Sequence, residues 1–195
     1  MKSKVVIILS LLLLSTSLIF CQAKNEKETR IKFNELPNNI RNITKVLPKE
    51  TKRLKAYKEI DGLKKSFEIK LKYRNNRYSI EFSENGIIED IEIITTFNTL
   101  NKDVQILIEH YFKETYSKYK FIKIQKQYVF ENNIEASTFV RDILIKKYNP
   151  SSNFEIIAEV KKEKKRTIRE FTFNSKGLLI NSRIVNPSSY EYVLY

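Results

Sequence analysis

A motif that occurs twice constrains the fold of this chain more than any other feature of its sequence. Residues 78–93 read YSIEFSENGIIEDIEI, and residues 169–184 read REFTFNSKGLLINSRI. Both segments contain an aromatic strand, a polar turn that ends in glycine, and a second apolar strand; the aligned positions are Phe82, Gly86, Ile87, Ile88 and Ile93 with Phe173, Gly177, Leu178, Leu179 and Ile184. Because internal repeats indicate repeated structural units, the motif predicts two copies of one antiparallel unit.

The N-terminal segment, residues 1–23, predicts export. Lys2 and Lys4 give a short basic start, and an uncharged apolar run of 16 residues follows at positions 5–20. This order is typical of a secretory signal peptide, here cleaved after Ala23, and the run is shorter than the roughly 20 residues that span a bilayer. The alternative is a lipoprotein signal with Cys21 as the lipidated residue, although the large side chain before Cys21 disfavours it. We therefore expect a periplasmic or secreted protein that is not an integral membrane protein after cleavage.

The residue types that most enzymes need are scarce. The one cysteine, Cys21, leaves with the signal peptide, so the mature chain has no disulfide and no thiol nucleophile. The one histidine, His110, is expected at the surface of a helix and lacks the cysteines or clustered carboxylates of a metal site. Three glycines leave no glycine-rich phosphate loop. The sequence therefore predicts a non-enzymatic protein without catalytic residues, cofactor or metal.

One group of acidic residues allows two interpretations. Glu89, Asp90 and Glu92 follow one another on a predicted strand, where Asp90 and Glu92 project to the same face. Carboxylate oxygens of this kind suit Ca²⁺, which takes several oxygen ligands. Because no loop rich in aspartate or glycine lies beside them, a solvated outer face is the favoured interpretation.

The charge balance favours an anionic partner. The formal net charge is +13, and removal of the signal peptide lowers it only by Lys2 and Lys4. Such a balance favours an acidic protein, a polyanion or lipid headgroups, whereas nucleic acid is not expected for an exported protein. The densest basic run, at a predicted hairpin tip, supplies the candidate anion-binding residues Lys161, Lys162, Lys164, Lys165 and Arg166. A solvated turn is the simpler interpretation of this run, and charge neutralisation of a phosphate or sulfate is the alternative.

Periodicity predicts an α+β fold built from two units. Helices are expected between Pro37 and Pro48 and over residues 102–116, and alternating apolar residues predict strands at 53–60, 66–73, 77–83, 87–94, 119–130, 154–161, 166–174 and 178–185. Each unit is thus a helix followed by a four-stranded antiparallel meander, with the helices packed on one face of the sheet. The expected organisation is a signal peptide (1–23), a disordered linker (24–34), a first repeat (35–97) and a second repeat (98–195) that carries a helical insertion (131–153).

The strands at 66–73 and 77–83 form a predicted hairpin with a defined register. A two-residue loop at 75–76 suits asparagine, which tolerates the positive φ of tight hairpin turns. That loop pairs Leu71 with Ile80 in the core and Lys70 with Glu81 on the outer face. Agreement between the apolar pairs and the charge pair supports this register.

This pattern resembles the PepSY-like domains and the related tandem repeats similar to beta-lactamase-inhibitor proteins. The resemblance rests on Glu35-Leu36-Pro37 opening a helix, on the strand at 78–82 and on the turn at 83–86. It implies a small exported bacterial module of one helix and an antiparallel sheet, often found in pairs. It further implies a non-catalytic envelope protein that binds or inhibits another protein, and it carries over no active-site residues.

Two functional hypotheses follow from these features. The first is a binding module that engages or inhibits an unknown envelope or secreted protein through the open face or an edge of its sheet. The second is a basic surface protein that binds polyanions or membrane headgroups. The C-terminal residues 188–195 are expected to add an edge strand or to dock against the protein as a tail.

Overall fold

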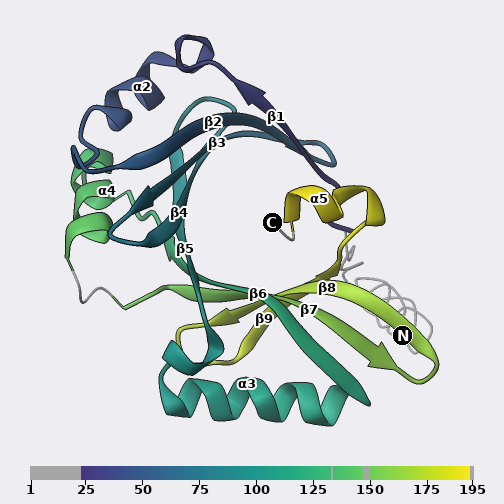
Figure 1. Cartoon of the computed structure of the whole chain (residues 1–195). Coiled ribbons are helices and arrows are strands. Elements are labelled where there is room, and N and C mark those ends of the chain that lie inside the picture. The colour runs from purple at the N-terminus through teal and green to yellow at the C-terminus, as the bar shows by residue number, and fades with distance from the viewer. Residues whose placement is uncertain (1–22, 133, 147–149, 194–195) are drawn as a thin grey trace, which may run out of the picture.

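The computed structural model describes residues 23–132, 134–146 and 150–193. It contains one nine-stranded antiparallel sheet in which every strand pairs with its neighbours in sequence, in the order β1-β2-β3-β4-β5-β6-β7-β8-β9 (Figure 1). The strands are β1 (Glu26–Ile31), β2 (Lys52–Asp61), β3 (Lys64–Tyr73), β4 (Asn76–Ser83), β5 (Ile88–Thr95), β6 (Lys118–Val129), β7 (Asn153–Lys162), β8 (Lys165–Asn174) and β9 (Leu179–Ile184).

The helices lie on two sides of this sheet. Figure 1 shows the sheet curled into a ring, with α2, α3 and α4 outside it and α5 inside, beside β1. The helical segments are η1 (Phe33–Glu35), α2 (Asn38–Thr44), η2 (Phe97–Thr99), α3 (Lys102–Thr115), α4 (Ala136–Ile145), η3 (Pro187–Ser189) and α5 (Tyr190–Val193). Within the described residues, no helix combines the length and the apolar character needed to cross a membrane.

The prediction of two helix-plus-meander repeats is wrong as a description of the fold. β5 pairs with β6 from Asp90↔Val129 to Thr95↔Ile124, so the sheet continues across the expected boundary between the units. The motif that occurs twice is nevertheless built alike in both places. Gly86 N–H donates to the carbonyl of Ser83 at 2.8 Å, and Gly177 N–H donates to that of Asn174 at 2.9 Å. Local repetition therefore produced two equal turns within one sheet, because neighbouring strands can pair whether or not they belong to the same repeat.

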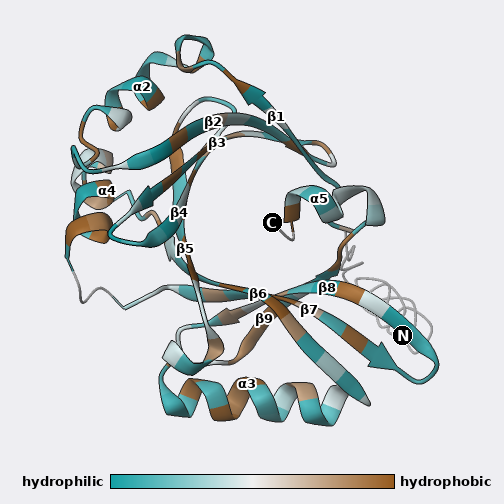
Figure 2. Cartoon of the chain, in the orientation of Figure 1, coloured by the Kyte–Doolittle hydropathy of each residue, from teal (hydrophilic) through white to brown (hydrophobic). Residues whose placement is uncertain are grey.

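Two apolar cores fill the space between the outer face of the sheet and the helices. The first packs α2 and α4 on β3, β4 and β5, and the second packs α3 on β6, β7 and β8. Figure 2 shows hydrophobic and hydrophilic residues alternating along the strands, as the period of two requires when one face is apolar. Asn101 accepts a hydrogen bond from Asp103 N–H at 2.9 Å and so caps the N-terminus of α3, as its position before the helix predicts.

The β3–β4 hairpin differs from its predicted register by two residues. Its loop is Arg74-Asn75, with φ of 45° and 65°, rather than the two asparagines that follow Arg74. Leu71 therefore pairs with Tyr78, and Glu68 lies directly opposite Glu81. The predicted register differed because it relied on asparagine for both positive-φ positions, whereas an arginine occupies the first.

The sheet closes on itself through the segment expected to be a disordered linker. Residues 26–31 of that segment form β1, which pairs with β2 along its whole length. Just before β1, Lys24 N–H donates to Ile184 O at 2.7 Å, and Asn186 N–H donates to Lys24 O at 2.8 Å, so that Lys24 and Val185 form a parallel bridge. The polar sequence of β1 has no apolar alternation, and so its pairing could not be recognised from periodicity. The predicted signal peptide, including Cys21, lies outside the described residues except for Ala23.

Residues 187–193 form η3 and α5 and dock inside the curled sheet, so the described part of the C-terminal segment follows the docked-tail alternative. Val193 and Tyr190 pack with Ile157, Ile168 and Val185 on the inner face. Ser188 Oγ lies 3.2 Å from Asn25 Oδ1, which ties this segment to the residues before β1. The face of the sheet that was expected to be open is thus enclosed, by its own curvature and by this tail.

Candidate functional site

The inner face of the curled sheet is lined by charged and polar side chains that are nonetheless buried. The alternation that sends apolar residues outward to the helices sends every second residue inward. Members of this inner set are Glu26, Glu68, Ser79, Asp90, Glu92, Gln125 and Glu170, all of them less than 10% exposed. Buried charges are stable only when they are paired, hydrogen-bonded or neutralised. The inner face is therefore where the chain departs furthest from an ordinary sheet.

One part of this face is a fully paired ion network at the seam, where the segment before β1 meets the segment after β9. Lys24 Nζ lies 2.6 Å from Glu170 Oε2 and 2.8 Å from Glu26 Oε2. Arg183 bridges Glu170 at 2.7 Å and Asp61 at 2.6 Å. Burial alone would raise the pKa of Glu170, but Lys24 and Arg183 lower it to about 2. These pairs join the first two strands to the last two, so their role is structural.

A second part is a cavity of about 350 Å³ at the end of the ring near the β3–β4 turn. Basic and aromatic side chains dominate its lining, which includes Arg53, Lys55, Tyr57, Lys70, Lys72, Arg77, Lys123 and Tyr192. Within the cavity, Lys70 is neutralised by Glu28 at 2.6 Å and by Glu68 at 3.2 Å. Burial and the charge of Glu68 raise the pKa of Glu28 to about 7, although Lys70 opposes this effect.

Four of the basic side chains at this cavity have no acidic partner in the part of the chain that the structure describes. Within the described ranges, no ion pair or hydrogen bond involves the side chains of Arg53, Lys55, Lys72 and Arg77. Lys72 lies directly opposite Arg77, and Lys55 lies opposite Lys70, so like charges face each other across neighbouring strands. Directly opposed like charges destabilise a sheet unless an anion lies between them. This arrangement suits the carboxylates or phosphates of a ligand.

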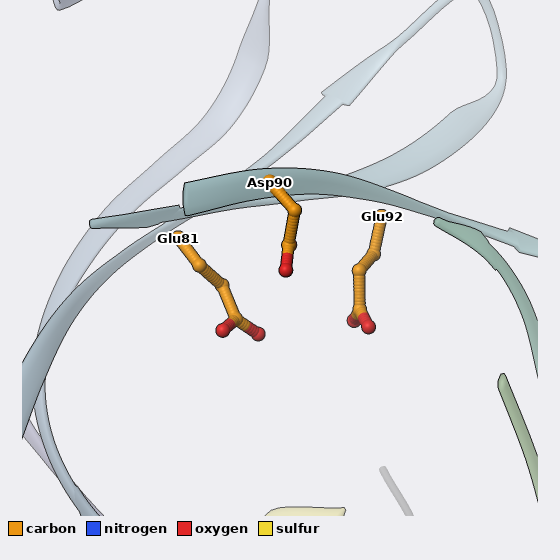
Figure 3. A group of neighbouring side chains, drawn as sticks. All are labelled: Glu81, Asp90 and Glu92. Atoms are coloured by element: carbon orange, nitrogen blue, oxygen red, sulfur yellow. The ribbon is translucent and has the colours of Figure 1, made fainter. Parts of the chain in front are cut away.

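A third part is a cluster of three carboxylates on β4 and β5. One carboxylate oxygen from each of Glu81, Asp90 and Glu92 lies within 4.8 Å of the others, and Figure 3 shows all three side chains pointing into the ring. Burial and the charge of Glu155 raise the pKa of Asp90 to about 7, and the same two causes raise that of Glu92 well above its usual range. Burial, Asp90 and Glu92 likewise raise the pKa of Glu81.

The sequence interpretation of these acidic residues was wrong in one respect. Asp90 and Glu92 do share a face, but that face is buried rather than solvated, because the sheet curls over it. The predicted pair of Lys70 with Glu81 does not form, because Lys70 pairs with Glu68 and Glu81 lies opposite Glu68. No signal in the sequence marks this burial, because the polar face of an antiparallel strand alternates with a core face in the same way whether it is solvated or enclosed.

The candidate anion-binding residues lie where the sequence placed them, at the tip of the β7–β8 hairpin. Lys162 pairs with Lys165, and Lys161 pairs with Arg166, next to the turn. Arg166 forms an ion pair with Glu159 on the neighbouring strand, so its charge is partly compensated. None of these five residues lines the cavity. His110 is exposed on α3, as expected.

Comparison with known proteins identifies a similar fold, but it does not identify a family for this chain. No family model matches the chain, and no curated protein matches it. A DUF2874 family protein from Bacteroides ovatus has a similar structure, with a TM-score of 0.50 and 11% identity over 76% of this chain and 86% of that one. A BLIP-like protein from Bacteroides fragilis gives a TM-score of 0.46 at 15% identity, covering 77% and 88% of the two chains. A Bacteroides eggerthii protein proposed to be periplasmic gives 0.48 at 8% identity, covering 76% and 88%.

At 11% identity, the similarity to the DUF2874 protein from Bacteroides ovatus is a similarity of fold alone. The PepSY-like assignment has no support, because no family model matches. The chain therefore shares the fold of a DUF2874 protein, and the roles of its residues rest on its own geometry.

Proposed function

We propose that the protein is an exported, non-enzymatic binding module that engages an acidic segment of another envelope or secreted protein at the cavity near the β3–β4 turn. The observation that carries this proposal is a set of four basic side chains that have no acidic partner among the described residues, around a cavity of about 350 Å³. The order of basic, apolar and small residues at the N-terminus supports export.

A peptide suits this cavity better than a stiff polyanion. Tyr57 and Tyr192 stand among the basic residues, and such rings provide apolar surface and a hydroxyl for contact with a side chain. The cavity is also concave and mixed in polarity, as is usual where a ligand inserts rather than lies flat. Polyanion binding at the hairpin tip of Lys161, Lys162, Lys164, Lys165 and Arg166 is the alternative, and it uses a different part of the surface.

The two proposals separate in one binding experiment. A fluorescein-labelled hexaglutamate peptide and a labelled heparin hexasaccharide are titrated with the mature protein, and fluorescence anisotropy is recorded at low and at moderate salt. The triple variant Lys55→Gln/Lys72→Gln/Arg77→Gln removes three charges at the cavity. The variant Lys162→Gln/Lys164→Gln/Lys165→Gln removes three charges at the tip and serves as the matched control.

Loss of the cavity charges should weaken peptide binding about tenfold or more, the equivalent of about 1.4 kcal/mol, while the tip variant should bind the peptide as the unmodified protein does. Peptide binding should also weaken with salt, because exposed charges are screened. Equal losses of peptide affinity in both variants would show that binding depends only on the net charge of the protein. Heparin binding that depends on the tip, without peptide binding, would establish the polyanion alternative in place of the first proposal.

A further inference from the structure

The carboxylate cluster on β4 and β5 lacks the positive charge that its burial demands. Asp90 and Glu92 are 9% and 7% exposed, and Glu81 beside them is half-buried. The lysines whose charges influence Asp90 and Glu92 each pair with, or donate a hydrogen bond to, another group. Lys64 pairs with Glu89 at 2.6 Å, Lys24 with Glu170 at 2.6 Å, and Lys123 donates to the carbonyl of Val193 at 3.2 Å. Within the described part of the chain, no ion pair reaches the three carboxylates of the cluster.

The spacing of the three carboxylates matches the size of one cation. Their nearest oxygens all lie within 4.8 Å of one another. Ca²⁺ binds oxygen ligands at about 2.3–2.6 Å, so two ligands on opposite sides of the ion are about 5 Å apart. All three carboxylates can therefore reach the same ion without movement of β4 or β5. Figure 3 shows that their side chains converge on the same side of these strands.

A second observation points independently to a ligand at this place. Asp90 Oδ1 is fully buried and has no hydrogen-bond partner among the described residues, and the side chain that carries it points into the cluster. Its other oxygen, Oδ2, accepts a hydrogen bond from Gln127 Nε2 at 3.0 Å. Glu92 accepts one from the amide of Gln125. The two amides hold the carboxylates in position, as outer partners of metal ligands do, and leave a buried oxygen that needs a positive partner.

We infer that Glu81, Asp90 and Glu92 form a binding site for a divalent cation, and that this cation is Ca²⁺. The donor set contains only carboxylate oxygens, which favour hard cations over Zn²⁺ or copper. Ca²⁺ accepts irregular coordination by six to eight oxygens and bidentate carboxylates, whereas Mg²⁺ requires near-ideal octahedral geometry. The half-buried position of Glu81 leaves room for water to complete the coordination. This site differs from the basic cavity in its residues and in the charge of its ligand.

The test compares thermal unfolding of the EDTA-treated protein with and without 10 mM CaCl₂, for the unmodified chain and for two variants. Asp90→Asn removes the central ligand charge. Glu89→Gln makes the matched change at the next position of the same strand, where the side chain pairs with Lys64 instead. For a dissociation constant of about 0.1–1 mM, the unmodified protein and Glu89→Gln should each gain about 5 °C in Tm from Ca²⁺. Asp90→Asn should gain nothing.

The Tm of the Asp90→Asn variant in EDTA also serves as a control for misfolding. Because Asp90→Asn replaces one of three crowded, buried carboxyl groups by a neutral amide, its Tm in EDTA should equal or exceed that of the unmodified protein, and so a lost response to Ca²⁺ cannot be ascribed to misfolding. Isothermal titration calorimetry should show one site in the unmodified protein. No gain in Tm with Ca²⁺, an equal gain in Asp90→Asn, or a gain with MgCl₂ alone would each overturn the assignment.

Discussion

At the scale of single residues, packing against a helix explains why glycine stands at the same position in both copies of the repeated turn. Gly86 has φ of 72°, and a Cβ atom at this position would lie 2.5 Å from Asn39 Oδ1 on α2. Asn39 Nδ2 in turn donates to Gly86 O at 2.6 Å. Gly177 has φ of 83°, and its Cβ would approach the backbone of Val104 on α3 at 3.1 Å. Each glycine thus lets a helix lie directly on a turn of the sheet.

Replacement of Gly86 by alanine should destabilise the protein more than the same change at Gly62. Gly62 also has a positive φ, of 62°, but no atom lies within 4 Å of the position of its Cβ. Gly62→Ala should therefore cost only the left-handed backbone strain of about 1–2 kcal/mol, whereas Gly86→Ala adds the clash with Asn39. Urea unfolding measures both free energies. Equal costs in the two variants, or no relief of Gly86→Ala by Asn39→Ala, would contradict this explanation.

At the scale of elements, strands and helices could be predicted wherever apolar residues recur with a clear period. The alternation along β3 and β4 and the stripe on α3 are of this kind, and those elements lie within one or two residues of the expected positions. β1 was missed because its sequence, EKETRI, is polar on both faces. The register of β3 with β4 was missed because Arg74 adopts a conformation that favours asparagine or glycine. Which residues pair across two strands depends on the backbone conformation of the turn between them, and the periodicity of the sequence does not specify that conformation.

The packing of α3 should depend strongly on one fully buried side chain. Phe112 is fully buried, and its ring centroid lies 4.7 Å from that of Phe171 and 5.0 Å from that of Phe121. Phe112→Ala should lower the free energy of unfolding by about 3–5 kcal/mol, through lost burial and the cavity that remains. Ile106→Ala on the same helix, at a position that is 64% exposed, should change it by less than about 0.5 kcal/mol. Chemical denaturation checks both, and similar costs would show that α3 does not pack as described.

At the scale of the whole molecule, the curl of the sheet could not be read from the sequence, and neither could the buried inner face that it creates. Alternation identifies two faces of a strand, but a polar face looks the same whether it meets water or the far side of the same sheet. The acidic cluster and the basic cavity both follow from this closure. Their residues were visible as charged positions at spacing two, and only the arrangement of nine strands brings them together.

This closure makes stability depend on pH through Glu59. Burial raises its pKa to about 8, and the charges of Glu26 and Glu68 add to the effect while Lys24 opposes it. An unfolded glutamate titrates near 4.3, so between about pH 4.3 and pH 8 the folded chain holds a proton that the unfolded chain has lost. The contribution of Glu59 to stability is therefore complete below this window and falls as the pH rises through it.

Glu59→Gln should flatten the pH profile of stability in that window. Denaturation of the unmodified protein and the variant in EDTA, at intervals from pH 4 to pH 9, gives the difference between their free energies of unfolding. That difference should shift in favour of the variant as the pH rises from 5 to 8. Glu84→Gln, at the exposed β4–β5 turn, should follow the unmodified protein. A difference that is constant with pH would mean that Glu59 is ionised throughout.

The order of the strands also has a consequence for how the chain folds. Every strand pairs with its neighbour in sequence, so the eight strand pairs that build the sheet join segments close along the chain. This arrangement favours rapid folding. The bridge between Lys24 and Val185 differs, because it joins the segment before β1 to the segment after β9. The entropy lost on closing a loop grows with its length. The seam should therefore form last during folding and open first during unfolding.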